Sequence, residues 1–118
     1  MSVAEAIANN RERLFEVMFA TTDRTLQTPE FAIKQFIQGF IAVLEAAAQG
    51  DDSTRDLYLN SVIPALREGT MPFSTILTSM LRVTAAAACV LGPEHVIWVA
   101  NYCADYTARL VSVWEQRS

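Results

Sequence analysis

The sequence ILTSMLRVTAAAACVL, residues 76–91, decides the fold class of this chain. It has the length of a helix, carries a single charge at Arg82 and contains four consecutive alanines, Ala85 to Ala88. A helix that is apolar on nearly all sides is buried inside a protein, and small side chains let a neighbouring element approach it closely. We therefore expect a central helix, whose alanines pack against either another helix or a ligand.

Helix start and stop residues recur along the rest of the chain. Thr28 and Pro29 favour a helix start, and Gly50 favours a helix end. Pro64 cannot donate a hydrogen bond to the preceding turn, so a kink or restart is expected near Ser61. The expected helices are 3–19, 30–49, one that begins at residues 51–53 and ends at 67–69, one from 73 or 74 to 91, and one from 93 or 94 to 116. The prediction is an all-α single domain over residues 1–118.

The amino-acid composition limits the classes of partner that the protein is expected to bind. The chain has 118 residues, of which 52% are hydrophobic and 19% charged, and a net charge of -4. A chain of this length buries roughly 65% of its unfolded surface, which is enough for one core. With Lys34 as the single lysine and no basic cluster, we expect no nucleic-acid and no membrane partner. The apolar excess instead suggests a protein partner surface.

The N-terminal residues and the longest apolar run indicate where in the cell the protein is expected. Residues 1–5 lack the basic segment and the apolar core of a signal peptide, so we expect a cytoplasmic protein. The longest unbroken apolar run is 85–91, far shorter than the ~20 residues that a membrane span needs. No segment is therefore expected to cross a bilayer.

The residues that could carry catalysis or bind a metal are few. His95 is the single histidine, directly after a helix stop, and we expect it on the surface. Cys89 and Cys103 lie in apolar helical patterns and are interpreted as buried free thiols. Asp51 and its acidic neighbours are interpreted as helix-capping charges rather than a calcium loop. No nucleotide, zinc or nucleophile-elbow motif occurs, so neither an enzyme nor a cofactor is predicted.

Arg82 is the charge that most needs an explanation, because burying it unpaired would be costly. Its guanidinium could extend to the rim of the protein or pair with an acid such as Asp105. Alternatively it could contact an anion or partner inside a pocket formed by small residues. The candidate ligand pocket is then Arg82, Ala85, Ala86 and Cys89.

The last expected helix carries two apolar stripes. One makes an ordinary core face, and beside it Trp98, Tyr102 and Tyr106 form an aromatic row with four-residue spacing. The row is a candidate dimer interface if it packs on a second copy. The alternative is one wide face that lies in a groove of the same domain.

The segment 66–114 resembles the N-terminal sensor domains of RsbR-type stressosome proteins, a non-haem globin-like family. The similar features are the order Leu66-Arg67-Glu68-Gly69, an apolar helix with Ile76-Leu77 and Leu81-Arg82, and a long final helix that ends in Trp114. The resemblance implies a globin-like bundle of about five to six helices, a homodimer, and a non-enzymatic sensor domain for signal transduction in the stress response. It implies a protein partner or small ligand and supplies no catalytic residues.

Three alternatives stay open at this stage. A haem globin needs a proximal histidine in an earlier helix, whereas His95 follows the stop at Gly92. A bilin-binding relative would attach its pigment to Cys89 near an aromatic-rich helix, but Val90-Leu91-Gly92 stands where that family has Leu-Arg-Asp. The third alternative is a small enzyme of undescribed type.

Overall fold

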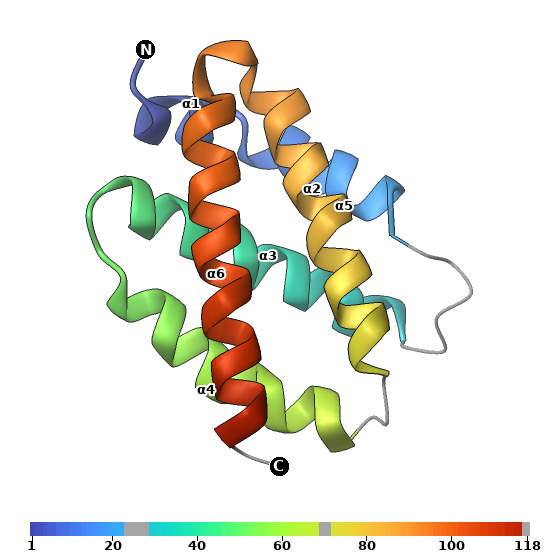
Figure 1. Cartoon of the computed structure of the whole chain (residues 1–118). Coiled ribbons are helices and arrows are strands. Elements are labelled where there is room, and N and C mark those ends of the chain that lie inside the picture. The colour runs from blue at the N-terminus through green and yellow to red at the C-terminus, as the bar shows by residue number, and fades with distance from the viewer. Residues whose placement is uncertain (23–28, 69–71, 117–118) are drawn as a thin grey trace.

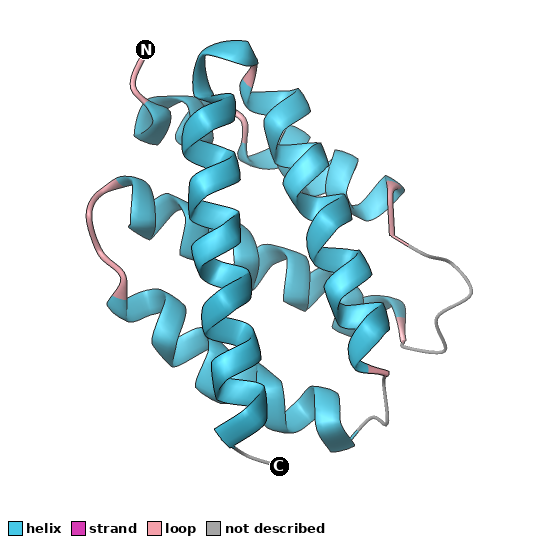
Figure 2. Ribbon diagram, viewed as in Figure 1, coloured by secondary structure: helices cyan, strands magenta, loops and turns pink. Residues whose placement is uncertain are grey.

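The computed structural model describes residues 1–22, 29–68 and 72–116. In these ranges the chain forms six α-helices, one short 3₁₀ helix and no strand (Figures 1 and 2). The prediction of an all-α domain is confirmed. The elements are α1 (Val3–Asn9), α2 (Arg11–Ala20), α3 (Glu30–Ala48), α4 (Ser53–Glu68), α5 (Phe73–Leu91), η1 (Pro93–His95) and α6 (Val96–Gln116).

Helices α5 and α6 form an antiparallel pair on one side of the molecule, joined by η1 (Figure 1). Behind them α3 crosses the bundle and packs against α4, which also contacts α6. Helices α1 and α2 lie at the other end, where both contact α5 and α3. The radius of gyration is 13.6 Å, close to the ~13.5 Å of a compact domain of this length.

The N-terminal segment differs from the single helix expected over residues 3–19. It is two helices, because the chain turns at Asn10, whose backbone angles are φ -122° and ψ 19°. The Asn10 side-chain amide donates to the Ala6 carbonyl at 2.8 Å, and its backbone N–H donates to the Ile7 carbonyl at 3.1 Å. An asparagine side chain that bonds its own backbone competes with helix continuation, so the predicted helix was wrong at this residue.

The glycine stops are confirmed at both predicted positions. Gly50 has a φ of +87° after α3, and Gly92 has a φ of +93° after α5, a region in which other residues are strained. Pro29 directly precedes α3 rather than being its first residue, and Thr28 lies outside the described residues. Pro64 lies inside α4, which runs as one helix without the expected restart.

The alanines of α5 divide between the inside and the outside of the protein. Ala86 and Ala87 are buried at 4% and 0% exposure, whereas Ala85 is exposed and Ala88 is half-buried. Since α1, α2 and α6 all contact α5, the buried alanines meet other helices. Small side chains permit that close packing. The largest fully buried side chains of the core are Ile7, Leu14, Met18, Leu44, Leu59, Ile63, Val43 and Val99.

Two helices, α3 and α5, are long and apolar enough to span a membrane by length and composition, with mean hydropathies of 1.3 and 1.5. Their mean hydropathies meet this criterion, although neither helix contains an unbroken apolar run of ~20 residues. Both also supply residues to the buried core, and core helices of globular proteins pass the same test. The finding is weak support for a membrane, and the absence of a bilayer span stays a prediction.

Candidate ligand cavity

An apolar cavity of about 140 Å³ lies between α3, α4, α5 and α6. Among the described residues, its lining contains aliphatic and aromatic side chains, two hydroxyl side chains besides the tyrosines, and no charged residue. The lining residues are Thr22, Ile33, Phe36, Ile37, Phe40, Tyr58, Val62, Leu66, Ile76, Ser79, Met80, Val83, Tyr106 and Leu110. Cavities lined in this way favour small uncharged ligands.

Tyr58 forms a fixed part of the cavity wall, where α4 crosses α3. Its hydroxyl donates to the Phe36 carbonyl at 2.8 Å. Its ring lies so close to Gly39 that a β-carbon there would overlap the ring edge. Burial raises the pKa of Tyr58 well above its ordinary value, so the hydroxyl stays neutral. Gly39 on α3 thus lets the Tyr58 ring of α4 approach closely, and the hydrogen bond to the Phe36 carbonyl holds the ring there.

Tyr106 enters the cavity from α6. Its side chain is 2% exposed, and its ring packs edge-on against Phe40 with the ring centres 5.0 Å apart. Burial, followed by the proximity of Tyr58, raises the pKa of Tyr106 well above its ordinary value. This hydroxyl is therefore a neutral donor at physiological pH.

A cation–aromatic cluster joins the ends of three helices next to the cavity. The Arg67 guanidinium of α4 lies 4.5 Å from the ring centre of Trp114 on α6 and donates to the Trp114 carbonyl at 2.9 Å. Phe73 of α5 stacks on the same indole at 4.7 Å. The cation lies at the C-terminal end of α6, where the helix dipole favours positive charge.

The cavity-lining residues lie on the same helices, close to that cluster in sequence. Leu66 directly precedes Arg67, and Leu110 lies one turn before Trp114. Ile76 follows Phe73 by about one turn, so all three helix ends that meet in the cluster also contribute to the cavity wall. A ligand that moved these side chains would act directly on the end of α6.

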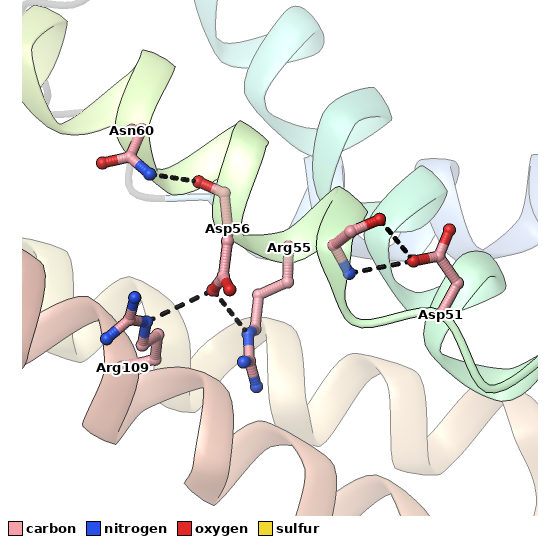
Figure 3. A network of polar contacts seen from close by, with 6 residues as sticks. Asp51, Arg55, Asp56, Asn60 and Arg109 are labelled. Atoms are coloured by element: carbon pink, nitrogen blue, oxygen red, sulfur yellow. Dashed lines mark hydrogen bonds and ion pairs between the residues drawn. The ribbon is translucent and has the colours of Figure 1, made fainter.

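A polar network ties α4 to α6 outside the cavity (Figure 3). The Asp56 carboxylate accepts from Arg109 Nε of α6 and from Arg55 Nε, each at 3.2 Å. Burial raises the pKa of Asp56, but the hydrogen bonds from Arg109 and Arg55 lower it by more. Asp51 caps α4 by accepting from the Ser53 backbone at 2.9 Å, which confirms the capping interpretation for this residue.

The four residues predicted as a pocket are not brought together around a cavity. Ala86 is buried in the core, while Arg82, Ala85 and Cys89 are exposed. Arg82 Nη1 lies 3.4 Å from the Thr21 carbonyl, a weak contact at the protein surface. This matches the expectation that the guanidinium extends to the rim. The cavity instead borders the first half of α5, and its other walls come from helices that the alanine pattern does not reveal.

The aromatic row is mostly inside the protein. Tyr102 and Tyr106 are 9% and 2% exposed, and Trp98 is half-buried. Trp98 and Tyr102 stack at 5.3 Å, and burial, the largest cause, raises the pKa of Tyr102 to about 12. The dimer interface predicted here is corrected to the alternative, one wide face in a groove of the same domain.

His95 and the cysteines depart in part from their predictions. His95 was expected on the surface but is 8% exposed, because η1 contacts both α5 and α6 and turns the residue inward. Its Nε2 lies 3.6 Å from a Glu94 carboxylate oxygen, beyond hydrogen-bond range, and has no hydrogen-bond partner among the described residues. Cys103 is buried, as expected, and burial raises its pKa, whereas Cys89 is exposed.

Helices α5 and α6 carry a set of exposed residues, many of them small or apolar, that is here called the outer face. Leu81 and Ile97 are 74% and 77% exposed. Among the residues of this face, only Arg82 and Asp105 are charged. The outer face comprises Leu81, Arg82, Ala85, Cys89, Ile97, Ala100, Asn101, Ala104, Asp105 and Ala108.

Comparisons with protein-family models, curated proteins and solved structures found no significant match to this chain. In the described ranges, no group of three or more histidine, cysteine, aspartate or glutamate residues could hold a metal ion. The features that bear on function are therefore the cavity, its neighbouring helix ends and the outer face.

Proposed function

We propose that this protein is a non-enzymatic regulatory domain that binds a small apolar ligand in the cavity between α3 and α6. The observation that carries the proposal is the cavity itself, whose described lining is mainly apolar and includes no charged residue. An engineered apolar cavity of about 150 Å³ in another protein binds benzene or xenon. A volume of about 140 Å³ therefore suits a ligand of similar size.

The proximity of the cavity to the end of α6 supports a sensing role. Filling the cavity changes the packing of Leu110 and Leu66, which neighbour Trp114 and Arg67 in the cation–aromatic cluster. A ligand can shift α6 from one position to another only if it binds the protein more tightly in one of these positions than in the other. Occupancy of the cavity would be read out at the end of α6.

A cavity-filling variant tests the binding proposal. Val83 is half-buried and lines the cavity, so Val83→Phe places a ring where the ligand would sit. We expect methylenecyclohexane to raise the melting temperature of the wild type and to leave that of Val83→Phe unchanged, because ligand that binds only the folded state stabilises it. The matched control is Val17→Phe, a half-buried position of α2 outside the cavity. Equal responses in all three proteins, or no response in any, would overturn the proposal.

Readout at α6 has a spectroscopic test. Trp98 and Trp114 are the two tryptophans, so Trp98→Phe leaves Trp114 as the single indole. Trp114 is stacked on Phe73 and lies next to the Arg67 guanidinium, an environment that sets its emission. Methylenecyclohexane should shift the emission of this variant if the cavity and the cluster are coupled. An unchanged spectrum at a saturating ligand concentration would mean that binding does not affect the end of α6.

We further propose that the domain is a homodimer, with a second copy covering the outer face. The exposed Leu81 and Ile97 side chains among several alanines make an apolar surface that water does not favour. A two-fold interface pairs one patch with itself. The opposite charges of Arg82 and Asp105 provide the complementary pair that such an interface can use.

Charge insertion tests this interface. Leu81→Glu combined with Ile97→Glu should give a folded monomer by light scattering, because four carboxylates would meet in the dimer. The control is Leu57→Glu on α4, which is 73% exposed and lies outside the outer face. A wild type that is monomeric at the same concentration, or a double variant that stays dimeric, would contradict the assignment.

The resemblance to stressosome sensor domains supports placing the domain in signal transduction, with a globin-like arrangement and a cytoplasmic location. Two of the residues that carry it, Arg67 and Trp114, contact each other at the end of α6. The haem and bilin alternatives each predict a coloured protein. An absorption spectrum without a Soret or bilin band after purification from the native host would remove them.

A further inference from the structure

The two tyrosines that line the cavity differ in whether their hydroxyl groups are already engaged. Tyr58 donates to the Phe36 carbonyl at 2.8 Å. Tyr106 is 2% exposed, and no hydrogen bond involves its hydroxyl within the described part of the chain; unlike the Tyr102 hydroxyl, this oxygen is not fully enclosed. A hydroxyl in such apolar surroundings is free to donate to a molecule that enters the cavity.

The placement of Tyr106 makes a ligand a suitable partner for that donor. Its ring lies against Phe40, and both residues line the cavity. Tyr102 has a fully enclosed hydroxyl that also lacks a hydrogen-bond partner, but Tyr102 does not line the cavity. Of these two tyrosines on α6, Tyr106 is therefore the one that lines the cavity.

The rest of the lining limits the charge of that molecule. Among the residues that the structure describes, no arginine, lysine, histidine, aspartate or glutamate lines the cavity. A carboxylate or ammonium group would lose its hydration there without gaining a counter-ion, which is costly. The Ser79 hydroxyl donates to the Thr75 carbonyl at 2.9 Å, so this donor is already used inside α5.

We infer that the cavity is built for a neutral, mainly hydrocarbon molecule with one hydrogen-bond acceptor, such as a small ketone, aldehyde or ester, which accepts from the Tyr106 hydroxyl. This inference rests on the proposed ligand-binding function and specifies its ligand class. The apolar walls provide affinity, and the single donor provides orientation and selectivity. A site that pairs a buried hydroxyl with a ligand acceptor discriminates against an analogue that lacks the acceptor.

Two isosteric probes isolate the acceptor. Cyclohexanone and methylenecyclohexane share their ring and shape and are close to benzene in size, but only the ketone has an oxygen acceptor. Dissociation constants of both probes are measured by chemical-shift titration with the wild type, Tyr106→Phe and Tyr58→Phe. Comparing the ratio of the two constants between proteins cancels the difference in hydration of the free probes.

Tyr106→Phe should weaken cyclohexanone binding about fivefold to tenfold and leave methylenecyclohexane binding at least as tight, since one neutral hydrogen bond is lost. Tyr58→Phe is the matched control. It removes a hydroxyl from the same cavity wall, but one already bonded to the backbone, so it should leave the ketone-to-alkene ratio unchanged.

The outcomes separate this inference from the proposed function. If both probes bind and Tyr106→Phe weakens them equally, or if Tyr58→Phe is the variant that lowers the ratio, the ligand class is wrong and the binding function stands. If neither probe binds the wild type, the binding function itself fails and the inference fails with it. Thermal melting of each variant confirms that it is folded before titration.

Discussion

The two ends of the molecule use the same kinds of residue for different purposes. In the region where α1 and α2 pack on the second half of α5, the side chains of Ile7, Leu14 and Ala87 are fully buried, and none of them lines the cavity. In the region between α3 and α6, equally apolar residues such as Ile37 and Leu110 surround a space of about 140 Å³. Close packing stabilises the first region, whereas incomplete packing in the second leaves room for a ligand.

Matched leucine truncations should give the largest difference between the two regions. We expect Leu14→Ala to lower the free energy of unfolding by about 4–5 kcal/mol and Leu110→Ala by about 3 kcal/mol, because Leu110 already borders empty space and loses fewer contacts. Urea unfolding monitored by circular dichroism measures both. Leu57→Ala at the surface should change the value by less than about 0.5 kcal/mol. Equal losses for Leu14 and Leu110 would remove the distinction between the regions.

A smaller effect is expected at the cavity wall. Alanine is favoured over glycine in a helix by about 1 kcal/mol. Gly39→Ala should nevertheless destabilise the protein by about 1–3 kcal/mol, because the new methyl group overlaps the anchored Tyr58 ring. In a Tyr58→Leu background the same substitution should cost much less, as a double-mutant cycle would show. A stabilising effect of Gly39→Ala in the wild type would mean that the ring is not held there.

The smallest effect concerns the polar network over the cavity region. The pKa of Asp56 is lowered in the folded protein, so its contribution is present above the unfolded value of about 3.9 and is lost as the pH falls through the folded pKa. Its side chain is 40% exposed, so solvent screening limits the effect of Asp56→Asn to about 0.5 kcal/mol at pH 7. Unfolding free energies of the two proteins should converge near pH 2. A difference that grew on acidification would contradict the assignment.

The local sequence predicts helices better than it predicts the space between them. Gly50 and Gly92 mark helix ends because their backbone conformation depends on the residue itself. The break at Asn10 escaped prediction because the apolar spacing continues through it. The cavity could not be predicted, since Ile37, Met80 and Leu110 follow the same periodic pattern whether a neighbouring side chain or a void lies beside them.

The same limit explains the errors at the candidate sites. Four-residue spacing placed Tyr102 and Tyr106 on one stripe of a helix, but the spacing does not say whether that stripe faces the core or a partner. The burial of His95 depends on how η1 packs against both α5 and α6, and the local sequence does not specify that packing. Alanine composition identified α5 as a central helix, and only the packing of its neighbours shows that Ala85 faces outward.

Xenon binding shows directly whether the space between α3 and α6 can hold an apolar ligand, because xenon occupies apolar cavities without needing any hydrogen bond. A crystal of the wild-type protein under xenon pressure should show an ordered xenon atom between Ile37, Phe40 and Leu110, and none among Ile7, Leu14 and Ala87. A Val83→Phe crystal treated in the same way should lose that atom. A wild-type crystal with no xenon in the cavity, or with equal occupancy in the α1–α2 region, would contradict the account.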